Sequence, residues 1–146
     1  MSESIQGNVA EASVWAHVTG RFDPERLTAQ GVRPYSVRRF GEPTLRRNRP
    51  AQEDRWSLRA ELESADFGPS LEKLVTQLES IGTTLSDLVD QGGVRIMVTF
   101  SVYLLGNPHS TVPNLYLDRD MVRRLAALHA DLDVDINLLE EDEPEQ

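Results

Sequence analysis

The chain has 146 residues, of which 39% are hydrophobic, and a net charge of −9, which suits one folded domain with a core of its own. The absence of cysteine excludes disulfides, thiolate metal sites and a cysteine nucleophile. No apolar run approaches the roughly 18 residues of a membrane span, and the amino-terminal segment lacks the features of a signal peptide, so we expect a cytoplasmic protein.

Opposite charges gather in two parts of the chain. Eight arginines and three acidic residues lie between Arg33 and Arg59, whereas eight acidic residues and no lysine or arginine are found from Asp131 onward. We expect an exposed basic loop over 44–54 and an acidic, flexible tail over 140–146. A charged partner for either block is the alternative.

The amino-terminal half predicts three strands and one short helix. Residues 1–12 have no periodic apolar pattern and are expected to form a disordered lead-in. Asp23 as N-cap and Pro24 at the first helical position predict a helix over 24–30. Alternating apolar and polar residues predict strands over 13–21, 37–40 and 55–62.

The carboxy-terminal half predicts a helical region, a strand, a helix and a strand. Leucines at helical spacing mark 69–91 as helical, and Gly82 leaves open whether this is one bent helix or two. A strand is expected over 94–105, and Asp118 is expected to cap a helix over 119–130. A closing strand follows, and its apolar face is expected to be buried through Leu132, Val134, Ile136 and Leu138.

These elements predict a single α+β domain over 13–139. Each strand has one apolar face, so we expect an open, mainly antiparallel sheet of four or five strands with all helices packed on one face. The order strand, helix, strand occurs twice, which predicts two pseudo-repeated halves on a ferredoxin-like plan. The other face of the sheet should be polar and exposed.

Several segments together carry a family resemblance. They are FDPERLT after Gly20, then GVRPY, FGEPT and RWSL, and finally LYLDRDMVRRLAALHADLDVDI. Across roughly 13–139 the chain resembles a bacterial family known as domain of unknown function 4279. The resemblance implies a small single-domain protein and supplies no activity or catalytic residues. Some small acidic proteins of this kind look like immunity partners of secreted toxins.

The sequence contains no familiar catalytic or metal-binding motif. No two histidines have metal-ligand spacing, and nucleotide-binding and hydrolase motifs are missing. The spacing of Asp131, Asp133 and Asp135 is similar to the start of an EF-hand loop, but the glycine and glutamate of that loop are missing. We therefore expect no metal, no cofactor and no catalytic residue.

Binding is expected on the exposed face of the sheet. Tryptophan, tyrosine, methionine and arginine are enriched at interfaces. The candidate binding residues are Trp15, His17, Arg55, Arg59, Met97, Tyr103, Asp133 and Asp135. The arginines of this face, with Arg95, are expected to compensate the aspartates of the closing strand. Two alternatives are cross-strand pairing with nothing bound and coverage of the aromatic rings by residues 32–54.

The sequence therefore predicts a non-enzymatic protein-binding module, of which an immunity-type protein acting against a toxin is one form. An acidic surface would favour a basic target. One alternative is a small-molecule-sensing or regulatory domain with a pocket at the sheet–helix seam or a dimer interface. Another is an enzyme that uses His17 with Arg55 or Arg59 and Asp133 or Asp135. The net charge disfavours nucleic acid, and the oligomeric state stays open.

Overall fold

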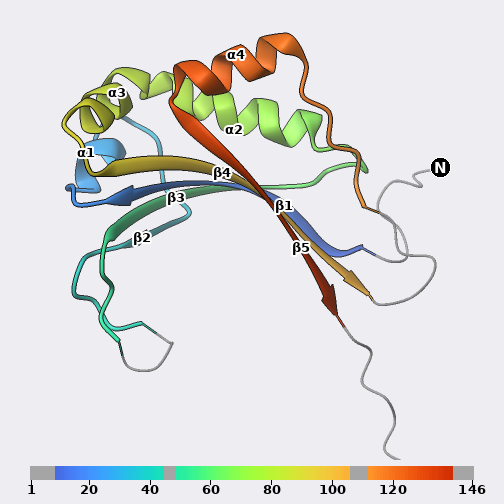
Figure 1. Ribbon diagram of the computed structural model, residues 1–146, viewed down its shortest axis with the longest axis horizontal. Coiled ribbons are helices and arrows are strands. Elements are labelled where there is room, and N and C mark those ends of the chain that lie inside the picture. Colours follow the sequence, from blue (N-terminus) through green and yellow to red (C-terminus); the bar gives the residue numbers. More distant parts are fainter. Residues whose placement is uncertain (1–8, 45–48, 106–111, 140–146) are drawn as a thin grey trace, which may run out of the picture.

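The computed structural model describes residues 9–44, 49–105 and 112–139. Its elements, in chain order, are β1 (Val9–Gly20), α1 (Glu25–Thr28), β2 (Ser36–Arg38), β3 (Asp54–Glu61), α2 (Gly68–Ser80), α3 (Gly82–Asp90), β4 (Val94–Leu105), α4 (Arg119–Ala127) and β5 (Ala130–Leu139). The strands form one five-stranded sheet in the order β2-β3-β1-β4-β5. Figure 1 shows the longer helices over one face of this sheet. The α+β class and the open sheet are confirmed.

The sheet is mixed, with one parallel pair. Strand β1 runs antiparallel to both β3 and β4, and β2 runs antiparallel to β3. Strand β5 runs parallel to β4, and α4 forms the crossover connection that adjacent parallel strands need. Because β1 and β3 are antiparallel while β4 and β5 are parallel, the two predicted halves differ in topology, and the ferredoxin-like pseudo-repeat is not confirmed.

The core lies between the sheet and the helices. Alternate residues of β1, β3 and β4 are buried there, as the sequence predicts, and the rings of Phe67 and Phe100 pack edge to face with centroids 5.2 Å apart. Trp56, on the same face of β3, is fully buried, and its indole nitrogen donates to the hydroxyl of Thr28 at 3.1 Å. That bond places α1 on the same side of the sheet as the longer helices.

The structure resolves one helix boundary that the sequence left open and shortens one predicted helix. The helical region 69–91 divides into α2 and α3 at Ile81, which has φ −115° and ψ 19° and is buried. Helix α4 begins as predicted, with the amide of Met121 donating to the Asp118 carboxylate at 2.8 Å. It ends before residue 130, because His129 adopts the left-handed conformation with φ 59° and turns the chain into β5.

The first strand and the basic loop also differ from the prediction. Strand β1 begins at Val9, so residues 9–12 belong to the sheet and not to a disordered lead-in. Residues 1–8 and 140–146 lie outside the described residues, as do 45–48 of the predicted loop. Within that loop Ala51 and Asp54 are buried, so the prediction of an exposed segment is wrong at its carboxy-terminal end.

Asp54 ties three segments together at the start of β3. One carboxylate oxygen accepts the amide of Phe22 at 3.0 Å, and the other accepts the amide of Phe40 at 2.8 Å. The guanidinium of Arg21 lies 3.7 Å from the same carboxylate and 3.8 Å from the ring centroid of Phe40. A charged acceptor with two amide donors makes strong hydrogen bonds, so the ends of β1 and β2 are held to β3.

The apolar face of β5 is not buried, contrary to the prediction. The residues of β4 that lie beside this face are buried, for example Phe100 beside Val134 and Val98 beside Leu132. The exposed fractions along β5 are 45% for Leu132, 51% for Val134, 47% for Ile136 and 70% for Leu138. Strand β5 is at the edge of the sheet, and Figure 1 shows its carboxy-terminal half extending away from the helices. The helices therefore leave the apolar face of β5 largely uncovered.

Candidate functional site

The sheet face opposite the helices, here called the open face, carries all eight candidate residues. Strand register places their side chains in rows that cross β3, β1, β4 and β5 in that order. The rows are Arg55–Thr19–Arg95, Ser57–His17–Met97–Asp131, Arg59–Trp15–Thr99–Asp133 and Glu61–Ser13–Ser101–Asp135, with Tyr103 next along β4. The predicted alternation of these strands is therefore confirmed.

Trp15 lies near the centre of the open face and is half-buried. Its indole nitrogen donates to the hydroxyl of Ser13 at 3.0 Å, and its ring stacks on His17 with centroids 5.4 Å apart. Tyr35 packs edge-on against it at 5.2 Å. The side chain is thus held in one orientation while part of its ring remains exposed, which is the geometry of a pre-organised contact residue.

Arg59 extends over the aromatic pair. Its guanidinium lies 5.3 Å from the ring centroids of both Trp15 and Tyr35, within the range of a cation–π interaction. The same group makes an ion pair with Glu61 at 3.2 Å and contacts the Tyr35 hydroxyl at 3.4 Å. Tyr35 precedes β2, and strand alternation gave no reason to assign it to this face. Its contact with Trp15 agrees in part with the alternative that residues 32–54 cover the aromatic rings of this face.

His17 forms a hydrogen-bonded pair with Ser57, whose hydroxyl lies 2.7 Å from the imidazole Nδ1. Burial, and secondarily the positive charge of Arg55, lowers the pKa of His17 to about 4, so the ring is neutral near pH 7. Ser57 is completely buried even though it is on the open face, and Ser13 and Ser101 on the same face are also buried. A weak base with an inaccessible hydroxyl is suited to positioning rather than to nucleophilic catalysis.

A hollow of about 340 Å³ opens on this face. It falls in the size range of small-ligand pockets. Five candidate residues line it, namely Trp15, His17, Arg55, Tyr103 and Asp135, together with Ser36, Ser57, Thr99 and Ser101. The other three candidates, Arg59, Met97 and Asp133, lie on the same face outside the lining. Ser36 was not expected here, because the short edge strand was predicted to begin one residue later.

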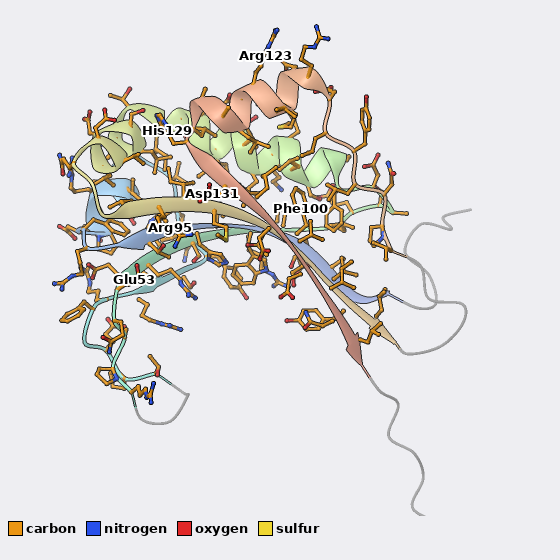
Figure 2. All side chains as sticks on the ribbon, in the orientation of Figure 1. Glu53, Arg95, Phe100, Arg123, His129 and Asp131 are labelled. Carbon is orange, nitrogen blue, oxygen red and sulfur yellow. The ribbon has the colours of Figure 1, made fainter. Side chains whose placement is uncertain are left out.

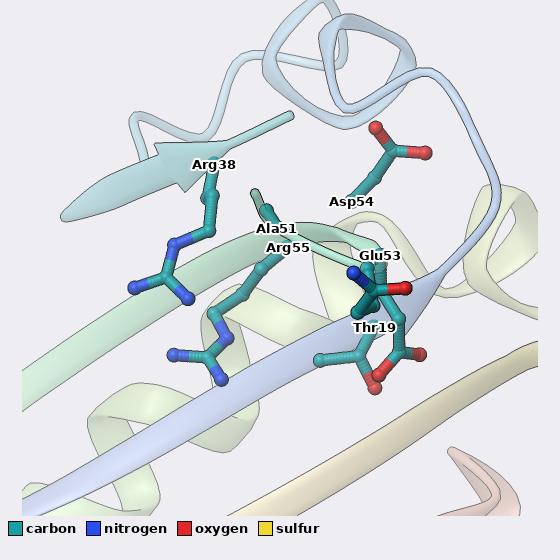
Figure 3. Close-up of a pocket in the computed structure, with 7 residues that line it drawn as sticks. Thr19, Arg38, Ala51, Glu53, Asp54 and Arg55 are labelled. Atoms are coloured by element: carbon teal, nitrogen blue, oxygen red, sulfur yellow. The ribbon is translucent and has the colours of Figure 1, made fainter. Parts of the chain in front are cut away.

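Positive charge gathers at one side of the open face, in an arginine flank made of Arg38, Arg55 and Arg59. Arg38 and Arg55 are register partners on β2 and β3. Figure 3 shows their side chains extending in the same direction, beside a recess of about 80 Å³, while Asp54 points the other way. Burial, and then the like charge of Arg38, lowers the pKa of Arg55.

Negative charge gathers at the opposite side, in an acidic row made of Asp131, Asp133 and Asp135 on β5. Only one arginine reaches it among the described residues: Arg95 lies 4.0 Å from Asp131 (Figure 2). The expected compensation by Arg55 and Arg59 is wrong, because β1 and β4 separate β3 from β5. Three strand spacings amount to about 14 Å, so the arginine flank and the acidic row remain separate.

Two further observations concern metals and membranes. Within the described ranges, no group of three histidine, aspartate or glutamate residues is arranged to hold a metal ion. The helices of those same ranges include none with the length and apolar character needed to span a bilayer.

Comparison with known proteins gives one match. The family described as "Domain of unknown function (DUF4279)" matches residues 10–139, nearly the whole chain. The comparison finds no matching curated protein and no matching solved structure.

Proposed function

The chain belongs to the DUF4279 family, whose description assigns no activity, and from its open face we propose that it is a protein-binding module. The observation that carries this proposal is the arrangement of charge around held aromatic rings. Trp15 is at the centre, the arginine flank lies on one side and the acidic row on the other. Tryptophan, tyrosine and arginine are the residues that most often dominate binding energy at protein interfaces.

The central residues are ordered before any partner arrives. Trp15 is fixed by Ser13 and His17, and Arg59 is fixed by Glu61. Binding through these side chains costs less conformational entropy than binding through free rotors would. This supports a contact surface rather than a purely structural set of cross-strand pairs.

The charge pattern specifies the partner's surface. Acidic groups of the partner would meet the arginine flank, and basic groups about 14 Å away would meet the acidic row. The net charge of −9 accelerates the approach of a basic protein, with an effect that weakens as salt rises. An immunity-type protein that covers the site of a basic toxin is the specific form of this proposal.

The test compares two charge reversals on the open face with one on the helix side. Arg38→Glu and Asp133→Lys change exposed residues of the arginine flank and the acidic row, and Arg123→Glu changes an exposed residue of α4. A partner captured from the source cells at low salt and then purified is expected to bind wild type and the Arg123→Glu variant equally. Each open-face variant should bind at least about tenfold more weakly. Equal binding by all four proteins contradicts the proposal.

A small-molecule sensor is the second candidate, and the hollow of about 340 Å³ favours it. Arg55 and the hydroxyl of the exposed Ser36 in its lining suit an anionic ligand. A metabolite that raises the melting temperature of wild type, but not of an Arg55→Ala variant, supports this function. A metabolite screen in which no anion stabilises the wild-type protein counts against it.

A further inference from the structure

The apolar stripe of β5, made of Leu132, Val134, Ile136 and Leu138, lies on a different surface from the open face. Its side chains point to the helix side of the sheet, yet about half or more of each is exposed. No helix or strand within the described ranges covers them. Four exposed aliphatic residues at alternate positions of one strand exceed the scattered exposure that is normal for a protein surface.

The main chain of β5 is available for pairing along the same edge. Strand β5 is the last strand of the sheet, so every second residue directs its N–H and C=O groups away from β4. Edge strands are usually blocked by charged side chains, lysine above all, by proline, by a bulge or by short length. The charges of β5 are the aspartates of the acidic row, which would repel an acidic or identical strand but attract a basic one. Residues 130–139 contain no lysine or proline, and their register with β4 continues without a shift from Ala130 to Leu139. This edge therefore offers a long template without a bulge.

Charge decides which strand fits this template. If residues 132–138 paired antiparallel with the same segment of a second copy, Asp135 would lie opposite Asp135. In parallel register, every member of the acidic row would face its own counterpart. Like charges directly opposite one another destabilise a strand pair. The acidic row therefore disfavours a second copy and favours a strand with basic residues at alternate positions.

We propose that β5 receives an extended segment of another protein in which arginine or lysine alternates with valine, isoleucine or leucine. The segment joins the sheet as a sixth strand by main-chain hydrogen bonds, which is a recurring mode of peptide recognition. Its aliphatic side chains cover the apolar stripe, and its basic side chains meet Asp133 and Asp135. This inference goes beyond the proposed function because it uses the sheet edge and the helix side of β5. The two surfaces share only the acidic row.

The test uses the whole chain and a synthetic peptide. The probe is a fluorescently labelled nine-residue peptide in which arginine alternates with valine, and its control has glutamate in place of arginine. Anisotropy is expected to show binding of the arginine peptide and at least about tenfold weaker binding of the glutamate peptide. Amide resonances of residues 130–138 should shift on binding, while those of β2 should not.

Matched variants separate strand addition from simple charge attraction. Val134→Lys in the apolar stripe and Val122→Lys, at an exposed position of α4, make the same change in net charge. Only Val134→Lys should weaken binding, by about tenfold or more. The double variant Asp133→Lys/Asp135→Lys should prefer the glutamate peptide. Arg38→Glu should leave peptide binding unchanged, so failure of this inference is distinct from failure of the proposed function.

Methylation of the peptide backbone tests for main-chain pairing. N-methyl groups placed on the alternate residues that face β5 should abolish binding, whereas the same groups on the intervening residues should not. Equal effects of both methylation patterns, or equal effects of Val134→Lys and Val122→Lys, overturn the proposal. It is also overturned if the chain sediments as a dimer that Val134→Lys converts to a monomer, because a second copy would then occupy β5.

Discussion

The imidazole of His17 and the hydroxyl of Ser57 are 2.7 Å apart on the neighbouring strands β1 and β3. The ring of Trp15 stacks on the imidazole of this pair. The neutral ring fits this position well, since a charged ring would lose hydration and face Arg55. Protonation of His17 therefore opposes folding.

The first prediction concerns stability against pH. The pKa of His17 is about 4 in the folded protein, against the ordinary value of 6.5 that applies to the unfolded chain. Between these two pH values the unfolded state binds more protons, so the free energy of unfolding rises with pH. We expect the wild type to lose about 1–2 kcal/mol between pH 6.5 and pH 4 from this residue, after allowance for partial exposure. Urea denaturation should show that His17→Gln removes this part of the pH dependence. His129→Asn, at an exposed histidine, should retain it.

The second prediction concerns Asp54, whose two carboxylate oxygens accept different amides. Asparagine has only one acceptor oxygen, so Asp54→Asn must leave the amide of Phe22 or Phe40 without a partner. We expect Asp54→Asn to cost about 1–3 kcal/mol, and Asp54→Ala to cost more, because alanine leaves both amides without this partner. Limited proteolysis should cut both variants faster between residues 39 and 54. Wild-type stability of Asp54→Asn would show that the two bonds contribute nothing.

The third prediction concerns Arg124, which holds α4 against α2. Its guanidinium reaches Glu79 at 2.7 Å and Glu72 at 2.6 Å, and these bonds raise its pKa and lower that of Glu79. We expect Arg124→Ala, which removes two partly exposed ion pairs, to cost about 0.5–1.5 kcal/mol in thermal unfolding. Arg124→Lys should recover part of this loss, since lysine keeps the charge but not the planar fork.

The control for this clamp is Arg123→Ala, at the adjacent exposed residue (Figure 2), which should change stability by less than about 0.5 kcal/mol. Because the carboxylate of Glu79 has a lowered pKa when folded, its contribution is present near neutral pH and is lost as pH falls through that pKa. The difference between wild type and Arg124→Ala should therefore shrink in acid. A constant difference at every pH would contradict the role of the carboxylates.

The fourth prediction concerns Gly20, at the end of β1. It has φ +141°, and a Cβ placed there would lie 2.0 Å from the carbonyl oxygen of Gly93. Gly20→Ala should therefore cost about 3 kcal/mol or more, or prevent folding. Gly41→Ala, where φ is +86° and a Cβ meets nothing within 4 Å, should cost about 1 kcal/mol from backbone strain alone. Circular dichroism melts of the two variants measure the contrast.

Alternation in the sequence predicts which side chains share a face of a strand, but it does not predict what covers that face. Phe100 and Val134 are register partners with the same pattern around them, yet Phe100 is buried and Val134 is half-exposed. The difference depends on where the helices lie and where the sheet ends. These are properties of the tertiary structure, and the apolar residues of β5 do not encode them locally.

The same limit applies to the candidate site. The open-face residues of β1, β3 and β4 could be predicted because regular strands fix their direction. Alternation within each strand does not give the order of the strands in the sheet. The sequence therefore did not reveal that β1 and β4 lie between Arg55 and Asp133 and keep them apart. Strand alternation does not predict Tyr35, because this residue precedes β2, although its backbone amide donates to the carbonyl oxygen of Ser57 at 2.7 Å.

The central pairing of β1 with β4 has a consequence for biosynthesis. Val14 lies beside Phe100 in the sheet, so the innermost strand finds one of its two neighbours only after most of the chain has been translated. Topologies with such distant partners fold slowly, because the entropy of closing a long loop is lost before the strand pairing contributes favourable free energy. A ribosome-bound fragment that stops before Val94 exposes the edge of β1 and the apolar faces of α2 and α3, which makes it a natural client of chaperones.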